Sequence, residues 1–323
     1  MRALDIFWNI KNWYINLPII RKLNVSYLII ILVPIMLLSI LANKVSSDTI
    51  IKKTIHNSVQ NLNVVTESLD ELLGFAGNLS GIIVANDYIQ AVSPKTLNID
   101  EAKMFEYECV IRDVLDTIIQ PKNVVNSVAI YLDNGNIFGS SYVDTNKIDT
   151  EDISSKGYIE IFENNWGKPI HFDTHPVDYE IEKRAGNYIS LVRPVISVAN
   201  SEIVGRAELN ISENTISRIY SKIKYGKTGK FIVASYNGNI VSSSDKNEIY
   251  KSVKDQDYFK WAMDNTGSGR VFPISGKKYL ITSKKYSDME WVIMGIVPLS
   301  ELIADNRKVS ILICYRLYMH FPV

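Results

Sequence analysis

The chain begins with an uncharged apolar block, followed by apolar positions at helical spacing and then at strand spacing. The uncharged block runs from Leu23 to Ala42, twenty residues without Asp, Glu, Lys, Arg or His. A helix of about 20 apolar residues is long enough to cross the hydrocarbon core of a bilayer. Pro34 is tolerated there, because in lipid a single segment can satisfy the hydrogen bonds of its backbone N–H and C=O groups only as a helix. We therefore expect a transmembrane helix over residues 23–43.

The leader before this block, residues 1–22, is basic. Loops rich in Lys and Arg stay on the cytoplasmic side, so we expect a cytoplasmic N-terminus, a plasma-membrane anchor and an extracellular part over residues 44–305. A cleaved signal peptide is the alternative, but the leader is long and the residues after Leu41 form a poor cleavage site. The charges of the leader are Arg2, Lys11, Arg21 and Lys22 against Asp5.

The next block repeats at heptad spacing and predicts a long helix, followed by a second helix that begins at Asp100 and ends before Pro121. Both helices fall within residues 44–121. The long helix either packs on its own domain or also pairs with a second copy, and we expect a homodimer through its first half. The heptad positions are Ile51, Ile55, Ser58, Leu62, Val65, Leu69, Leu72, Ala76, Leu79 and Ile83.

Beyond residue 121 the spacing changes to period two, which is typical of strands. Residues 126–141 read as strand, Asn134-Gly135 turn and strand, and residues 230–244 repeat this pattern without a gap around Asn237-Gly238. Because the same short pattern occurs twice about a hundred residues apart, it indicates an internal duplication.

The duplication extends to the end of each unit. Residues 202–213 align with residues 290–301, and both units hold a helix with aromatic residues and two further strands between these landmarks. The fold class is therefore α+β. We expect two tandem domains, each an antiparallel sheet with helices on it, over residues 122–224 and 225–304.

Charge and candidate chemistry exclude several functions. Lys and Arg balance Asp and Glu, so net charge gives no argument for nucleic-acid binding. Gly226-Lys227-Thr228 is not a P-loop, since Ser221 stands where that motif needs glycine. His171 and His175 lie ~13 Å apart on an extended strand, too far to share a metal. No catalytic constellation is present, so we expect neither an enzyme nor a metal or cofactor.

The order of elements resembles the double Cache sensor domain of Gram-positive two-component sensor histidine kinases. The resemblance covers residues 16–313 and is carried by the anchor, by the duplication and by "YGKTGKFIVASYNGNIVSSS". In that family a second membrane helix, a HAMP linker and kinase modules follow. Here residues 305–323 begin like a membrane helix, but Arg316 interrupts it. We expect an aborted second membrane helix and a truncated receptor.

The resemblance implies a ligand pocket in the membrane-distal domain, between the sheet and its covering loops. Arg193 is the candidate for binding a carboxylate. Family members that bind amino acids carry an Arg-x-Trp-Tyr run and a later Asp. Here "FENNWGK" lacks that Arg and Tyr, and Asn210 replaces the Asp, so a sugar, peptide, other small molecule or extracellular protein stays open as ligand. The candidate ligand-binding residues are Tyr131, Tyr158, Trp166, Tyr188, Arg193 and Asn210.

These features together predict a membrane-anchored, extracytoplasmic ligand-sensing module of a receptor of the sensor histidine kinase type. A chemoreceptor or cyclase sensor, or an anchored binding or adhesion protein that does not signal, is the alternative.

Overall fold

The computed structural model describes most of the chain from residue 18 onward. The structure does not describe the side chains of Leu28 and of residues 156–159. The same holds for Trp166, for most of the basic leader and for the expected second membrane helix over residues 305–323. The described segments are residues 18–94, 99–120, 124–148, 156–165, 167–181 and 186–304.

The first element is a single helix, α2 (Ile19–Val84), of 66 residues. Among the described residues, α2 is the one helix that is long and apolar enough to cross a membrane. The side chains of its apolar stretch are mostly exposed. Residues 55–298 form one compact unit, whereas α2 up to Thr54 and the short helix α8 (Leu299–Leu302) belong to another.

Within the larger unit, α2 buries one stripe of side chains. The stripe follows the predicted heptad positions except that Leu73 is buried and Leu72 only half-buried. The departure is local, because the buried residues return to the predicted positions at Ala76, Leu79 and Ile83. From Ser58 onward the apolar stripe therefore packs inside the chain. Its buried members are Ser58, Leu62, Val65, Leu69, Leu73, Ala76, Leu79 and Ile83.

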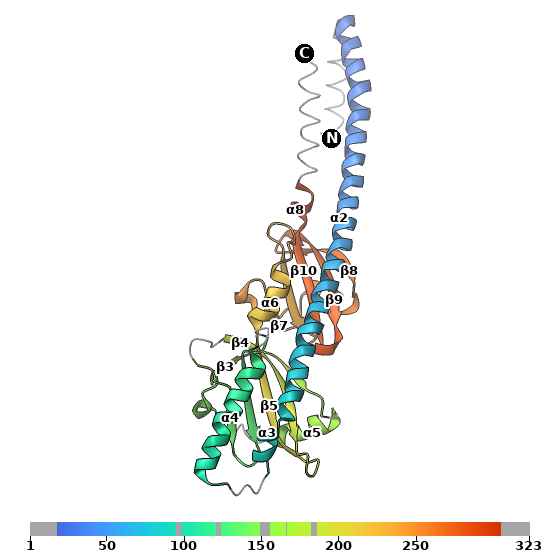
Figure 1. Ribbon diagram of the computed structural model, residues 1–323. Coiled ribbons are helices and arrows are strands. Elements are labelled where there is room, and N and C mark those ends of the chain that lie inside the picture. The colour runs from blue at the N-terminus through green and yellow to red at the C-terminus, as the bar shows by residue number, and fades with distance from the viewer. Residues whose placement is uncertain are drawn as a thin grey trace. The chain divides into compact units, whose positions relative to one another are not determined.

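The first module is an antiparallel sheet of five strands in the order β2-β1-β5-β4-β3. Helix α4 packs on β1 and β2, and it is capped by the Asp100 side chain, as the sequence predicted (Figure 1). The strands are β1 (Ser127–Leu132), β2 (Ile137–Gly139), β3 (Ile170–Val177), β4 (Gly186–Ile196) and β5 (Ile203–Ser212), and the helices are α3 (Asp87–Val92), α4 (Glu101–Ile119) and α5 (Lys156–Asn164).

The second module repeats this topology in the order β7-β6-β10-β9-β8, again antiparallel. The equal strand order confirms the predicted α+β fold with two sheets of one design. The strands are β6 (Lys230–Ser235), β7 (Ile240–Ser243), β8 (Ser268–Ile274), β9 (Lys277–Tyr286) and β10 (Trp291–Pro298). The helix of the second module is α7 (Asp257–Asp264), and its 3-10 turns are η4 (Lys246–Glu248) and η5 (Ser287–Met289). Helix α6 (Glu213–Ser221) follows β5 and ends the first module, which also holds the 3-10 turn η2 (Thr145–Lys147).

Both predicted Asn-Gly turns form at equivalent places. Gly135 has φ 90° and Gly238 has φ 88°, a left-handed conformation that glycine adopts without a steric penalty. They differ in surroundings, since a Cβ on Gly238 would lie 2.7 Å from Cα of Lys254, whereas no described residue comes within 4 Å of one on Gly135.

Each sheet has two distinct faces because successive side chains along a strand point in opposite directions. In the first sheet, Arg193, Ala207 and Ile130 share the face that packs on α2, as the contact of Arg193 with Gly77 shows. Tyr131 and Arg206 lie on the other face. In the second sheet, the face that corresponds to the Tyr131 and Arg206 face is filled by an apolar cluster that includes Phe259 of α7.

Candidate functional site

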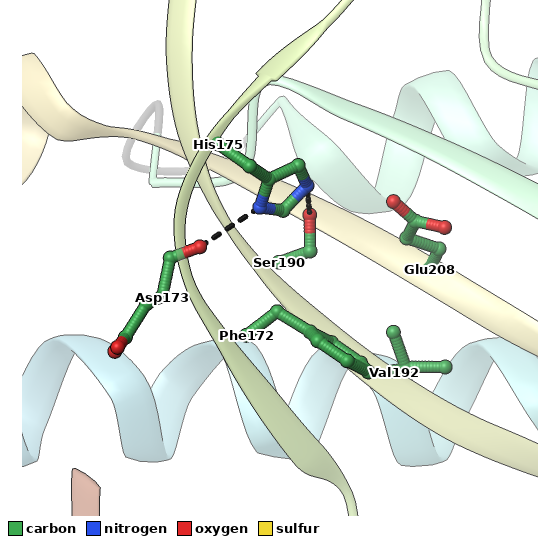
Figure 2. A pocket seen from close by; sticks show the side chains of 6 residues that line it. All are labelled: Phe172, Asp173, His175, Ser190, Val192 and Glu208. Atoms are coloured by element: carbon green, nitrogen blue, oxygen red, sulfur yellow. Dashed lines mark hydrogen bonds between the residues drawn. The ribbon is translucent and has the colours of Figure 1, made fainter. Parts of the chain in front are cut away.

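A pocket of about 430 Å³ lies on the face of the first sheet that is turned away from α2. Strand alternation places it there: Val192 pairs with Glu208, and Phe172 pairs with Ser190, so side chains from β3, β4 and β5 meet on one face. Its volume is within the range of small-molecule sites. The lining residues are Phe172, Asp173, His175, Ser190, Val192 and Glu208 (Figure 2).

Asn210 is the centre of a buried hydrogen-bond network beneath this pocket. Its Nδ2 donates to Oγ of Ser127 at 3.1 Å and to the Tyr179 hydroxyl at 2.8 Å. These two hydroxyls donate in turn to carboxylates, Ser127 to Glu180 and Tyr179 to Glu208 at 2.9 Å. Because carboxylates only accept, the directions of all four hydrogen bonds are fixed.

The same logic continues to His175. Ser190 must donate to Oδ1 of Asn210, at 2.5 Å, so its oxygen is left to accept from Nε2 of His175 at 3.1 Å. Nδ1 of His175 lies 2.8 Å from the backbone oxygen of Asp173, which also needs a donor (Figure 2). Both ring nitrogens of His175 are therefore committed to protein atoms.

Three of the residues that the sequence singled out lie on the pocket face of the sheet. Tyr188 is buried and donates its hydroxyl to Glu180. Tyr131 is buried in a cluster with Ala129, and the Arg206 guanidinium lies 4.2 Å from its ring centre. Asn210 is fully buried. None of the three lines the pocket directly, and Tyr188 and Asn210 support its floor.

Arg193 lies on the opposite face and does not join these residues. Its Nη2 donates weakly to the Gly77 carbonyl at 3.5 Å, its Nε is buried without a hydrogen-bond partner, and burial lowers the pKa of its guanidinium. It lines a separate pocket of about 180 Å³ beside Gln90. The reason is register: Tyr188 and Arg193 are an odd number of residues apart on one strand, so their side chains point in opposite directions.

The remaining predicted residues are not placed. Trp166 and the side chain of Tyr158 lie outside the described residues.

The sequence reasoning missed Glu208, Ser190 and Phe172. Period-two spacing held a usable signal for two of them, because Glu208 is two residues from Asn210 and Ser190 is two from Tyr188. Phe172 and Glu180 carried no such signal, since only the folded sheet brings β3 and the loop after it beside β4.

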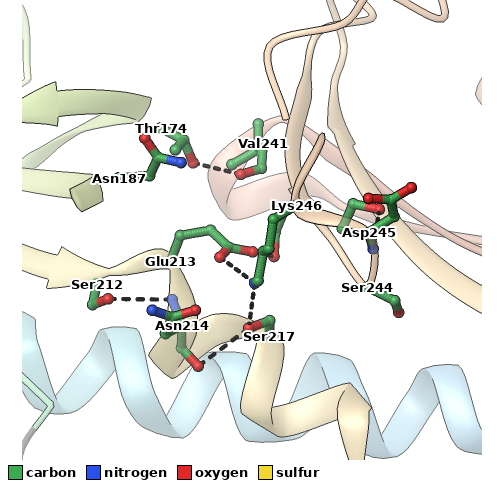
Figure 3. Close-up of polar contacts among 12 residues, drawn as sticks. Thr174, Asn187, Ser212, Glu213, Asn214, Ser217, Val241, Ser244, Asp245 and Lys246 are labelled. Atoms are coloured by element: carbon green, nitrogen blue, oxygen red, sulfur yellow. Dashed lines mark hydrogen bonds and ion pairs between the residues drawn. The ribbon is translucent and has the colours of Figure 1, made fainter. Parts of the chain in front are cut away.

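The pocket is directly connected to the second module through a bulge in β3. The strand register shifts between Phe172 and His175, so that Asp173 and Thr174 together oppose the single residue Ile189, and both contact the second module. Nε1 of the fully buried Trp291, the first residue of β10, donates to Oδ1 of Asp173 at 2.7 Å. Oγ1 of Thr174 donates to the Val241 carbonyl at 2.6 Å (Figure 3).

A buried ionic contact also joins the modules. The carboxylate of Glu213, at the start of α6, is buried, accepts from Oγ of Ser242 at 2.5 Å and pairs with Lys246 of η4 (Figure 3). Lys246 also donates to Oγ of Ser217 at 2.8 Å. The Tyr250 hydroxyl, from the second module, donates to Asn187 of β4 at 2.7 Å. The two sheets therefore meet through specific polar contacts within one compact unit.

Comparison with known proteins places this architecture in a family. Residues 46–305 match the Cache domain model dCache_1. A search of curated proteins found no significant match.

Similar solved structures include the sensory domain of the Campylobacter jejuni chemoreceptor Tlp3 with isoleucine bound, at 11% identity and a TM-score of 0.57, covering 80% of this chain and 97% of that one. Another is the ligand-binding domain of the Pseudomonas fluorescens chemoreceptor CtaA with L-serine, at 15% identity and a TM-score of 0.53, covering 76% and 98%. At these identities the structures establish the shared fold. Since the family model spans most of the sequence, the chain belongs to the Cache domain family.

Proposed function

We propose that this chain is a membrane-anchored, extracytoplasmic ligand-sensing module of a signalling receptor. One observation carries the proposal: β3 both lines the pocket and holds the second module. The apolar helix supports the anchor. The chemoreceptor domains of similar fold hold small molecules, namely isoleucine and L-serine, which supports a small-molecule ligand for the pocket. The proposal assigns the chain no catalytic activity.

The geometry supports a mechanism in which the ligand moves β3. A ligand in the pocket contacts Phe172 and His175, which flank the bulge. A shift there displaces Asp173 and Thr174, and thus the start of β10 at Trp291. The ligand selects one of two packings of the junction, and β10 leads in sequence into α8, toward the C-terminal end of the chain.

The alternative is an anchored binding or adhesion protein that does not signal. For such a protein a flexible linker between the modules suffices. The contact of Asp173 with the buried Trp291 and the pairing of the buried Glu213 with Lys246 favour signalling, because they make the position of one module depend on the other.

Hydrogen exchange tests this mechanism on the full chain in detergent. A thermal-shift screen of small metabolites first identifies a stabilising ligand. We expect that ligand to change amide exchange in β10 and β6 as well as in β3 to β5. The Thr174→Val variant should keep the affinity but lose part of the response in the second module. Protection confined to the first module would favour the non-signalling alternative.

The orientation in the membrane is tested by labelling Cys109. This thiol is free and exposed on α4, so in a Cys314→Ser background a membrane-impermeant maleimide should label it in intact cells. A cysteine placed at Lys11 should react only after the cells are permeabilised. The reverse result would overturn the proposed orientation.

The output type follows from the family resemblance: we propose a sensor histidine kinase, with a chemoreceptor as the second candidate, which the solved structures of similar fold favour. Fusing residues 1–304 to each kind of output module and measuring the ligand-dependent response would separate the two. A response through the chemoreceptor output alone would contradict the kinase proposal.

A further inference from the structure

We propose that the pocket takes an amine, a ligand whose ammonium group pairs with Glu208 and which carries no carboxylate. The inference deepens the proposed function, because it takes this pocket as the sensing site. It rests on which hydrogen-bonding groups of the lining are already used and which remain for a ligand.

The donors of the described lining are all engaged with protein atoms. The Ser190 hydroxyl donates to Asn210, and both ring nitrogens of His175 contact Ser190 and the Asp173 backbone. Phe172 and Val192 have no polar side-chain atom. An anionic group on a ligand would therefore meet no available side-chain donor among the six lining residues, and burying it without one is costly.

The acceptors of the lining are, in contrast, available. The half-buried carboxylate of Glu208 accepts one hydrogen bond, from the Tyr179 hydroxyl, and no Lys or Arg among the described residues pairs with it. Burial and the charge of Glu208 raise the pKa of Tyr179, so this phenol stays a donor to the carboxylate. A carboxylate has about four lone-pair positions, so most remain for a ligand.

The charge of the lining has the matching sign. Asp173 and Glu208 contribute two carboxylates, whereas a histidine contributes at most one positive charge, so the six residues keep a net negative charge. The nearby cation on this face, Arg206, lies over the ring of Tyr131 and is not among the lining residues. An ammonium group is the complementary ligand, and charged hydrogen bonds of this kind are the strong ones.

The rest of the pocket fits an apolar amine. Phe172 and Val192 provide an aromatic and an aliphatic wall within about 430 Å³ (Figure 2). The aromatic ring also favours a neighbouring cation.

The test compares three matched probes on the full chain in detergent by calorimetry: 3-methylbutylamine, leucine and 4-methylpentanoate. They share an apolar tail and carry an amine, an amine with a carboxylate, and a carboxylate. We expect the amine to bind at least tenfold more tightly than leucine, and the acid not to bind. Phenethylamine and putrescine extend the amine series in size. Equal or tighter binding of leucine, or no binding by any of the three amines, would overturn the proposal.

Two variants locate the interaction. Glu208→Gln keeps an acceptor for Tyr179 but removes the charge, and should weaken amine binding by about tenfold or more. Glu67→Gln removes an exposed carboxylate of α2 and should leave binding unchanged. Unchanged binding in Glu208→Gln would exclude the assigned ion pair. If amines fail but another metabolite stabilises the chain through this pocket, the sensing function stands and only the ligand class is wrong; if nothing binds, both fail.

Discussion

At the scale of single residues, polar groups on β3 are buried where they meet the second module. Nε2 of His171 is buried without a hydrogen-bond partner, on the face of β3 opposite to the pocket. Burial lowers the pKa of His171 below 6.5, and the nearby charge of Asp288 opposes this only in part. His175 lies on the pocket face instead, because the bulge reverses the alternation between the two histidines.

The neutral state of His171 gives the fold a defined pH dependence. Below pH 6.5, His171 takes up a proton in the unfolded chain, whereas in the folded chain it does so only at a lower pH. The stability from His171 is thus present above pH 6.5 and is lost as the pH falls through the lower folded-state pKa. We expect the urea midpoint of wild type to drop between pH 7.5 and pH 5, and His171→Gln to drop less. His56→Gln, on the exposed face of α2, should behave as wild type. Equal acid sensitivity of all three would contradict the assignment.

At the level of the elements, the two hairpins share a turn conformation that the duplicated sequence predicts, but they differ in packing. Both Asn-Gly turns have the same left-handed glycine, which follows from the local sequence. Their surroundings differ, because a Cβ on Gly238 would meet the segment around Lys254, whereas a Cβ on Gly135 would meet none of the described residues within 4 Å. Local conformation was therefore predictable, and packing was not.

Alanine at the two turn glycines should separate these contributions. Gly135→Ala should cost about 1–2 kcal/mol, the penalty for a left-handed residue with a Cβ. Gly238→Ala should cost about 1–3 kcal/mol more, because its Cβ also meets the backbone of Lys254 at 2.7 Å. Denaturant unfolding of the two variants measures both values. Equal destabilisation would show that the segment at Lys254 gives way.

At the scale of the whole molecule, the position of one module depends on the other through buried polar contacts. The ion pair of Glu213 with Lys246 is uneven, because Glu213 is 2% exposed whereas the Lys246 side chain is 45% exposed. The carboxylate bears most of the desolvation cost, so removing the lysine leaves a buried charge with hydroxyl partners alone.

We expect Lys246→Met to destabilise the chain by roughly 1–2 kcal/mol, less than for a fully buried pair because Lys246 is half in solvent. We also expect the modules to unfold at more separate temperatures in calorimetry. Lys260→Met, an exposed change on α7, serves as control. A single transition with unchanged midpoint would show that the ion pair does not couple the modules.

Local and periodic features could be predicted from the sequence alone: the apolar helix, the heptad stripe, both Asn-Gly turns and the duplication of the α+β unit. These depend on spacing along the chain, which the sequence displays directly. It also held the clue that Arg193 and Tyr188 lie on opposite faces, since they are an odd number of residues apart on one strand.

The tertiary structure decided what depends on contacts between distant segments. Asn210 was predicted to meet the ligand, and the structure places it one layer deeper, holding the groups that orient Glu208 and His175. The spacing of apolar and polar residues did not predict the β3 bulge or the contact of Asp173 with Trp291. Side-chain partners 118 residues apart in sequence are set by packing, and only the folded chain brings them together.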